Sequence, residues 1–436
     1  MTALERTSGT LSAISTRDRE VRRVAMASLV GTTIEWYDFL IYATMAGVIF
    51  NQYFFPKGDA FINTLLAYGT FAAGFLIRPF GGLLFGHFGD RIGRKPLLVL
   101  TLMIMGGATF LIGLVPTYER IGLWAPVLLL ALRLIQGVAL GGEWGGAVLM
   151  SYEFAGPDAR AYYASFPQIG LAIGLCCSTG VVTFLSYSLS SADFVAWGWR
   201  VAFMLSIVLL AVGLFIRLRV LETPEFTKAQ ANKQVARVPM WEVIRDYPGT
   251  VLLGWGARLI DGIAFTIYAI FPLSYLTTVA KIPRTTVLAA ITLAAFVLIF
   301  TIPYSSKLAD RTSRKRTYIL FSLINGFAAF PALWLMQYSG SGVMASAAIV
   351  LALGVLWAPV YGPQAAMFCD LFDTRVRYTG VSLVYQIGAI FSVSLTPLAA
   401  TALLHANGER PWLVAAYVAA AGVISAICAA LMRRVP

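Results

Sequence analysis

The stretch "GHFGDRIGRK", residues 86–95, combines glycines with an aspartate and three Lys or Arg residues. A related stretch, "SKLADRTSRK", occurs at residues 306–315, where serines replace two of the glycines. The aspartates of the two copies, Asp90 and Asp310, are 220 residues apart in a chain of 436. This spacing predicts a duplicated protein whose two halves share one architecture.

Long apolar stretches surround both polar copies. Across the chain 58% of residues are hydrophobic, only 12% are charged, and the mean hydropathy is +0.76. Soluble domains are about one quarter charged, whereas a helix that crosses a bilayer needs about 20 mainly apolar residues. We therefore predict an all-α polytopic membrane protein with twelve transmembrane helices. The predicted crossings are 24–50, 60–86, 96–116, 125–151, 162–187, 199–219, 249–275, 286–308, 316–338, 344–370, 380–405 and 412–432.

The predicted crossings divide into two pseudo-symmetric six-helix bundles. These are residues 24–219 and 249–432, with a central loop at 220–248 and tails at 1–23 and 433–436. With both termini in the cytosol, 24 of the 33 Lys and Arg residues lie on the cytosolic side and six on the external side. Basic residues favour the cytosolic side of a membrane, so we expect both termini and the central loop to be cytosolic.

The first loop matches the signature G-x-x-x-D-R-x-G-R-K of the major facilitator superfamily, and "RLIQGVALGGEWGG" at 133–146 resembles its proton-linked fourth-helix motif. "EWYDF" at 35–39, "WGWRVAF" at 197–203 and "TRVRYTGVSL" at 374–383 resemble the metabolite:proton symporter branch, which includes shikimate permease-type and dicarboxylate permease-type carriers. The resemblance implies the major facilitator fold, with parallel repeats about an axis along the membrane normal. It also implies a transporter of a bacterial inner membrane.

Ionisable side chains inside the predicted crossings are candidate functional residues. An ionised group at the bilayer centre costs at least about 2.5 kcal/mol, so it is expected to face a partner or a cavity. All but one of these residues lie on crossings 1, 4 and 7, which by resemblance line a central cavity together with crossing 10. They are Glu35, Asp38, Arg78, Arg133, Glu143, Arg258 and Asp261, with Arg78 as the exception.

The two acids of the first crossing, Glu35 and Asp38, are three residues apart and therefore neighbours on one helix face. Mutual repulsion and loss of water both disfavour two ionised carboxylates at close range. We predict proton coupling by this pair and by Asp261, with Asp38 as the proton carrier. The alternative is a permanent ion pair that holds helices together, and we favour that role for Glu35.

Two arginines, Arg133 and Arg258, are predicted to bind a substrate carboxylate, because a guanidinium stays charged and binds carboxylates with paired hydrogen bonds. The 220-residue offset relates Arg258 to Asp38, which suggests a salt bridge that protonation of Asp38 would break. The alternative is a local ion pair between Arg258 and Asp261. Further predicted substrate contacts are Gln136, Tyr361, Gln364 and Tyr37.

The remaining polar candidates are assigned to gating. Glu143 lies among glycines at helical spacing, which allow close helix approach, and Arg78 precedes Pro79 in the second crossing. The resemblance implies that Asp90, Arg91 and Arg94 of the first loop form a charged gate, whose ion pairs break and form again each time the transporter changes conformation.

These patterns predict a proton-coupled symporter that takes up a small organic acid anion by alternating access. A zwitterionic osmolyte carrier or a facilitative uniporter of the same fold remains the alternative. The chain lacks a G-x-x-x-x-G-K-[ST] stretch and has two histidines far apart, so we expect no enzyme activity, metal or cofactor. The expected partners are the substrate, protons and lipid; we expect no nucleic acid and a monomer as the functional unit.

Overall fold

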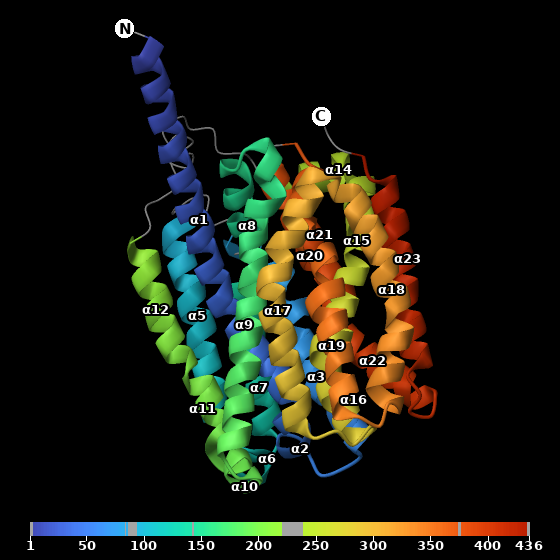
Figure 1. Ribbon diagram of the computed structural model, residues 1–436. Helices are drawn as coiled ribbons and strands as arrows, with labels where there is room; N and C mark the ends of the chain where they lie inside the picture. Colours follow the sequence, from blue (N-terminus) through green and yellow to red (C-terminus); the bar gives the residue numbers. More distant parts are fainter. Residues whose placement is uncertain are drawn as a thin grey trace.

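The computed structural model describes residues 3–82, 84–85, 94–141, 144–219, 239–373 and 376–433, with most side chains from Val21 onward. It is a bundle of long helices (Figure 1). The start of the first helix and the end of the last helix lie at the same end of the bundle. We call this end the terminal side and the opposite end the far side.

The first half of the chain forms the helices up to residue 219, and short helical turns separate some of them. They are α1 (Ala3–Met45), η1 (Ala46–Phe50), α2 (Asn51–Tyr53), α3 (Ala60–Leu76), α5 (Arg94–Leu114), α6 (Tyr118–Ile121), α7 (Trp124–Gly141), α8 (Trp144–Phe154), η2 (Pro157–Ala159), α9 (Arg160–Ser188), α10 (Ser191–Asp193), η3 (Phe194–Gly198), α11 (Trp199–Met204) and α12 (Ser206–Arg219).

The second half begins with a short amphipathic helix and continues with long crossings. Its elements are α14 (Pro239–Asp246), α15 (Pro248–Phe265), η4 (Thr266–Ile270), α16 (Phe271–Thr278), α17 (Arg284–Arg311), α18 (Arg314–Tyr338), α19 (Gly342–Ile349), η5 (Val350–Leu356), α20 (Ala358–Cys369), α21 (Arg377–Ala389), η6 (Ile390–Ser394), α22 (Thr396–Ala406) and α23 (Trp412–Leu431).

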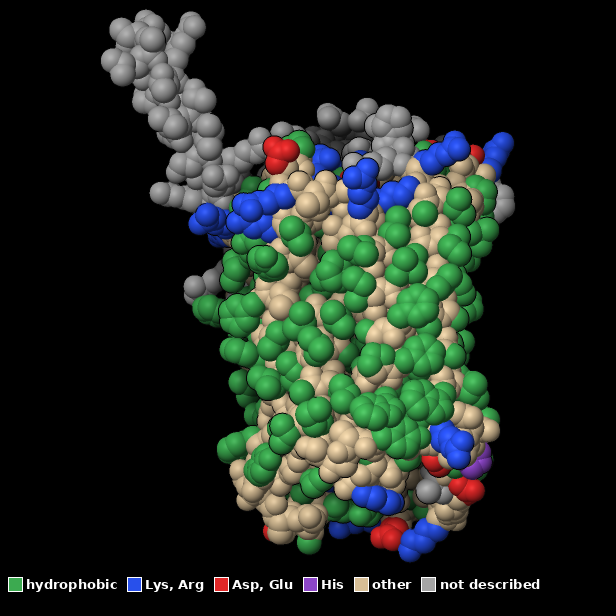
Figure 2. All heavy atoms as spheres, turned by 45° about the vertical axis from the view of Figure 1, so that its right-hand side comes forward, with side chains coloured by type: hydrophobic (Ala, Val, Ile, Leu, Met, Phe, Trp, Pro, Cys, Tyr) green, Lys and Arg blue, Asp and Glu red, His purple; other side chains and the backbone are tan. Residues whose placement is uncertain are grey.

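Ten helical stretches in the described part of the chain are long and apolar enough to cross a membrane. The other two predicted crossings coincide with the second part of α1 and with α5, whose apolar stretch Val99–Leu114 is shorter. Figure 2 shows apolar side chains over the middle of the visible face and Lys and Arg gathered toward the terminal side. A bilayer requires such a surface, because only backbones paired within helices or closed barrels cross it. The prediction of an all-α polytopic membrane protein is confirmed.

Glycines allow α3 and α7 to pack at very short range. A methyl group added at Gly137 or Gly141 would overlap the backbone carbonyls of Gly74 or Arg78. Gly145 of α8 faces Ser382 of α21 instead. Gly137 and Gly141 thus allow a close contact within the first half, and Gly145 allows one between the two halves. Small residues at helical spacing have this effect in membrane bundles.

The two halves meet along α9, which packs against α1 on one side and against α17 and α20 on the other. In Figure 1, α9 and α17 lie next to each other near the middle of the bundle. The predicted boundary at 220–248 falls largely outside the described residues. A cavity lined by residues of both halves, including Leu171 of α9, lies at this contact, and it is the candidate site.

Candidate functional site

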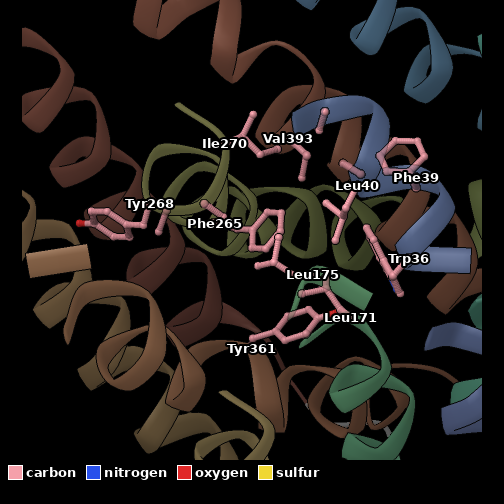
Figure 3. Close-up of a cluster of buried hydrophobic side chains, with 14 of the residues drawn as sticks. Trp36, Phe39, Leu40, Leu171, Leu175, Phe265, Tyr268, Ile270, Tyr361 and Val393 are labelled. Carbon is pink, nitrogen blue, oxygen red and sulfur yellow. The ribbon is translucent and has the colours of Figure 1, made fainter. Parts of the chain in front are cut away.

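A small cavity lies between the two halves and is lined mainly by rings. Eight of its fifteen lining residues are aromatic, and four more are aliphatic. Figure 3 shows Phe265, Leu171 and Tyr361 turned toward the same space from α15, α9 and α20, whereas Tyr268 points away from it. The lining residues are Trp36, Phe39, Leu40, Phe71, Phe75, Leu171, Arg258, Asp261, Gly262, Phe265, Ile270, Trp357, Tyr361, Tyr385 and Val393.

Arg258 supplies a positive charge to this cavity from α15. Its Nη1 donates to Asp261 Oδ2, one turn further along the helix, and to Gln364 Oε1 at 2.9 Å. Its Nε donates to the carbonyl oxygen of Tyr385 at 3.2 Å, and its Cζ lies 3.6 Å from the centroid of the Tyr385 ring. Gly388 packs against the stem of Arg258, where a Cβ would approach it to 3.1 Å. The guanidinium is therefore held in one orientation by contacts on several sides.

Polar atoms without partners surround this arginine. Asp261 Oδ1 and the hydroxyl oxygens of Tyr361 and Tyr385 are buried and have no hydrogen-bond partner. A buried polar group without a partner costs about 1–3 kcal/mol. The three residues line the cavity with Arg258, so a ligand that bonds to these atoms would recover part of that free energy.

The predicted salt bridge between Asp38 and Arg258 is absent from this conformation. Both carboxylate oxygens of Asp38 are buried without a hydrogen-bond partner, while Arg258 pairs with Asp261. The local pair at i and i+3 was the alternative that the sequence left open. The Arg258–Asp261 pair forms because both residues lie on one face of the same helix, so they meet without any movement of the two halves.

Arg133 lies behind the cavity wall rather than in it. Its Cζ is 3.8 Å from the centroid of the Phe39 ring and 4.4 Å from that of Tyr42, and its Nη1 donates to Gln136 Oε1 at 3.0 Å. Gln136 Nε2 donates in turn to the hydroxyl of Thr109 at 2.7 Å. Arg133 and Gln136 are not among the residues that line the space beside Arg258, and their role as substrate contacts stays a prediction.

Tyr37 and Gln364, two other predicted substrate contacts, are also not among the residues that line the cavity. The hydroxyl of Tyr37 donates to the carbonyl oxygen of Ala202 at 2.6 Å, which ties α1 to α11 inside the first half. Gln364 accepts from Arg258 and donates to the hydroxyl of Tyr318 at 3.1 Å, so it orients the arginine from behind. Among the predicted substrate contacts, Arg258 and Tyr361 are the two that line the cavity.

Arg78 is buried among aromatic rings of the first half. Its Cζ lies 3.9 Å from the ring centroid of Phe75 and 4.3 Å from that of Phe39. The Phe39 ring therefore has a guanidinium near it from both Arg78 and Arg133. Glu35 is buried and interacts electrostatically with Arg78 and Asp38. The Arg78 guanidinium thus lies between a ring of α3 and a ring of α1.

On the terminal side, the second copy of the loop signature connects the halves. Asp310 accepts hydrogen bonds from the backbone N–H groups of Ala161 and Tyr162 at 3.1 and 2.9 Å. These groups belong to the first turn of α9, where N–H donors lack helical partners and a carboxylate is favourable. Arg314 then bridges Asp310 at 2.7 Å and Asp370 at 3.0 Å.

Two further contacts extend this network across the halves. The hydroxyl of Tyr152 donates to Asp370 Oδ1 at 2.6 Å, and Arg314 Nη2 donates to the carbonyl oxygen of Pro157 at 3.2 Å. We call the set Asp310, Arg314, Asp370 and Tyr152 the terminal network. The predicted gate residues Asp90, Arg91 and Glu143 and the side chain of Arg94 lie outside the described residues.

Between the terminal network and the cavity, aromatic rings close the space. The rings of Trp144 and Tyr385 stack with an interplanar angle of 12°, and Arg258 lies on Tyr385 as well. Gln168 accepts from Trp144 Nε1 at 3.3 Å and donates to the carbonyl oxygen of Tyr361 at 3.1 Å. Trp144 and Gln168 belong to the first half, whereas Tyr385 and Tyr361 belong to the second, so this layer joins both halves next to Arg258.

The far side is closed as well. The hydroxyls of Tyr68 and Ser274 lie 3.0 Å apart, and the rings of Phe61 and His405 stack at 4.5 Å. Arg284 lies over the ring of Phe194, with Cζ 4.4 Å from its centroid. Each contact joins one half to the other. The described residues thus form an occluded conformation, with the cavity between two closed ends.

Sequence reasoning missed Tyr385 and the terminal network. Asp310 and Arg314 carried a signal, because the second loop copy keeps Asp and Arg at the positions of Asp90 and Arg94. Tyr385 carried none, since one tyrosine in an apolar helix resembles any packing aromatic.

Residues 29–393 match the sequence profile of the Major Facilitator Superfamily. The chain belongs to this superfamily. Among its relatives is the shikimate transporter of Escherichia coli K12, 39% identical over 429 residues, which cover 96% of this chain and 98% of that protein. The inner membrane metabolite transport protein YhjE of the same strain is 39% identical over 380 residues, 86% of each chain.

The major facilitator fold is confirmed by comparison with solved structures. A partially occluded inward-open structure of the xylose transporter XylE from E. coli superposes with a TM-score of 0.73. The match covers 93% of this chain and 96% of that chain at 15% sequence identity. The chain is thus a multi-pass membrane transporter of the superfamily and not an enzyme.

Proposed function

We propose that the chain is a proton-coupled symporter that takes up a small organic acid anion by alternating access. The observation that carries this proposal is the cavity between the halves, where the guanidinium of Arg258 is paired with the carboxylate of Asp261. A positive group that already holds one carboxylate has the geometry to hold another.

Competition for Arg258 supplies the coupling. While Asp261 is ionised, it neutralises Arg258 and leaves little attraction for a substrate anion. A proton that binds Asp261 removes this competitor, so Arg258 can donate its N–H groups to the substrate carboxylate. On the other side of the membrane the proton leaves, the ion pair forms again, and the substrate is released. The proton on Asp261 then accompanies the carboxylate, and the binding of each favours the binding of the other.

Asp38 is proposed as a second proton-binding group. Apart from the neighbouring Thr109 hydroxyl, no described group donates to its buried carboxylate, and an ionised carboxylate in such a place is costly. Thr109 lies beside Asp38 and also accepts a hydrogen bond from Gln136, which connects this acid to Arg133. Glu35, the neighbouring acid, is proposed to balance the charge of Arg78 rather than to carry a proton.

The terminal network is proposed as the gate that separates when the cavity opens on that side. Residues 24–219 and 249–432 would move as two units, and the Asp310 contacts with α9 would break and form again. Charge pairs with two alternative arrangements provide such a two-state element. Asp90, Arg91, Arg94 and Glu143 are proposed to serve the symmetry-related contact, and Arg78 is proposed to anchor α3 to α1.

We propose further that both termini lie in the cytosol and that the protein acts as a monomer in a bacterial inner membrane. The gathering of Lys and Arg at the terminal side supports this orientation, because cytosolic segments carry the excess of basic residues.

Uptake into proteoliposomes tests the proposal. The purified protein is reconstituted and offered a panel of radiolabelled organic acids, with and without an inward proton gradient. We expect one or more acids to accumulate above equilibrium only with the gradient. Equilibration that ignores the gradient would reduce the function to facilitative uniport, and transport of none of the acids would refute the proposal.

A zwitterion is the second candidate substrate, and one observation favours it. Asp261 Oδ1 is unpartnered next to Arg258, among aromatic rings that attract cations. A carboxylate on Arg258 and an ammonium group on Asp261 would satisfy both. The uptake panel therefore includes proline and glycine betaine, and their accumulation in place of simple acids would select this candidate.

A further inference from the structure

Three neighbouring aromatic rings, those of Phe265, Trp357 and Tyr361, form part of the cavity wall. Trp357 stacks on Tyr361 with centroids 4.3 Å apart and an interplanar angle of 17°, and Phe265 lies 5.3 Å from Trp357. The indole N–H of Trp357 donates to the carbonyl oxygen of Asp261 at 2.8 Å, which fixes the ring. These contacts hold flat apolar surfaces beside the guanidinium. A planar ring attached to a carboxylate has the matching shape.

Polar partners in the cavity are few. Beyond the Arg258–Asp261 pair, the described lining offers the hydroxyls of Tyr361 and Tyr385, and both lie near the same arginine. A substrate hydroxyl at the other end of the cavity would face Leu40, Ile270 or a phenyl ring. Each hydroxyl buried without a partner costs about 1–3 kcal/mol. A ring with several hydroxyl groups is therefore a poor match.

A second carboxylate is a poor match as well. Among the described residues that line the cavity, Arg258 is the one cation, and Asp261 already offsets its charge. The guanidinium groups of Arg78 and Arg133 lie behind the Phe39 ring and do not reach the space. An additional carboxylate would be buried against rings without a counter-charge, which is strongly unfavourable.

A second small cavity continues the apolar surface toward the far side. It shares Leu40 and Ile270 with the first, and most of its other lining residues are aliphatic. Its two threonines, Thr44 and Thr179, donate their hydroxyl protons to carbonyl oxygens of their own helices at 3.1 and 2.7 Å. The two threonine hydroxyls therefore have no proton left to donate to a substrate. This second cavity favours substrates whose non-carboxylate part is apolar.

We infer that the preferred substrate class is a monocarboxylate on a planar, largely unsubstituted ring, rather than a polyhydroxylated acid or a dicarboxylate. The inference rests on the proposed function, in which Arg258 binds a carboxylate. It adds that the ring lies against Phe265, Trp357 and Tyr361, with the carboxylate between Arg258 and the tyrosine hydroxyls.

Calorimetric binding to the full-length protein in lipid nanodiscs tests this class without the complication of acids that diffuse through bilayers. The probes are cyclohex-1-enecarboxylate, shikimate, benzoate and succinate. The first two differ only in three ring hydroxyls, which makes them a matched pair. We expect cyclohex-1-enecarboxylate and benzoate to bind at least about tenfold more tightly than shikimate and succinate, a difference of about 1.4 kcal/mol.

Tighter binding of shikimate or succinate would overturn the inference while leaving the proposed function intact. Binding of none of the four acids would overturn the inference, and the uptake panel would then decide separately whether the proposed function stands. Phe265→Leu tests the wall directly and should weaken benzoate binding about fivefold through loss of ring contact. Tyr268→Phe is the matched control, because Tyr268 points away from the cavity and its hydroxyl bonds only to Asn325 O at 3.5 Å. Equal effects of the two variants, or none at Phe265, would also contradict the inference.

Discussion

Arg258 and Arg133 are both buried arginines in membrane-spanning helices, yet their surroundings differ in kind. Arg258 has an acid one turn away, a glutamine behind it and the cavity in front. Arg133 has Gln136 beside it, aromatic rings over it, and two of its nitrogens without partners. Burial of a cation therefore does not by itself identify a substrate ligand. The side from which a ligand can approach the guanidinium decides its role.

The largest effect is expected from removing the charge of Arg258. Arg258→Gln alone would leave Asp261 buried and unpaired, which destabilises proteins by about 3–5 kcal/mol. The double variant Arg258→Gln with Asp261→Asn removes both charges and should fold. We expect its apparent affinity for the substrate to fall at least about 100-fold, since a buried charged contact contributes about 2–5 kcal/mol. Proteoliposome counterflow measures this affinity.

Arg133→Met is the matched control for this experiment. It replaces a buried guanidinium by an apolar side chain of similar length and removes one hydrogen bond to Gln136, a loss of about 1 kcal/mol in stability. The affinity in counterflow should stay within about threefold of the original protein, which is less than 0.7 kcal/mol. A loss as large as that at Arg258 would show that Arg133 does contact the substrate.

The acids beside the two arginines provide the next test. Asp38→Asn should abolish accumulation against a gradient while counterflow continues, because the proton site is lost but the carboxylate site remains. Asp261→Asn should also abolish accumulation, and it should in addition leave Arg258 permanently available, so substrate binding becomes stronger and loses its dependence on pH. Binding measured from pH 5 to pH 8 separates the two variants. Concentrative uptake by Asp38→Asn would remove Asp38 from the coupling mechanism.

A smaller effect is expected from the glycine beside each arginine. In Gly388→Ala the new methyl would lie 3.1–3.3 Å from the stem of Arg258, which its ion pair prevents from moving. Such overpacking costs about 1–3 kcal/mol, and we expect the KM for uptake to rise severalfold. In Gly74→Ala the new methyl group would lie 2.8 Å from Nε of Arg133 and would force that side chain to shift. Thermal unfolding should show a lower Tm for this variant, with an unchanged KM.

The smallest effect is expected from Tyr37→Phe, compared with Tyr361→Phe. The Tyr37 hydroxyl bonds to Ala202 O outside the cavity, so its loss should reduce stability by about 1 kcal/mol and leave the KM unchanged. The Tyr361 hydroxyl is buried without a partner in a residue that lines the cavity, so its loss should raise the KM and should not lower the Tm. The reverse pattern would show that the cavity is not the binding site.

Helix positions were predictable because membrane crossings obey a local rule. A backbone that leaves water must form its hydrogen bonds within one helix, so long apolar runs correspond directly to crossings. The predicted crossing 286–308 lies within α17, and 412–432 coincides closely with α23. The duplication was visible for the same reason, since both loop copies interrupt apolar runs at related places. The ion pair of Arg258 with Asp261 was also within reach, because i and i+3 neighbours follow from helix geometry.

The sequence by itself thus determined the class of protein, its crossings and the costly charges within them. Only the tertiary structure decided which of those charges meet a cavity. Whether rings screen Arg133, whether Tyr385 stacks between Arg258 and Trp144, and whether Asp310 caps α9 depend on the rotation of each helix about its axis. That rotation is set by packing between residues far apart in the chain, and no local pattern encodes it.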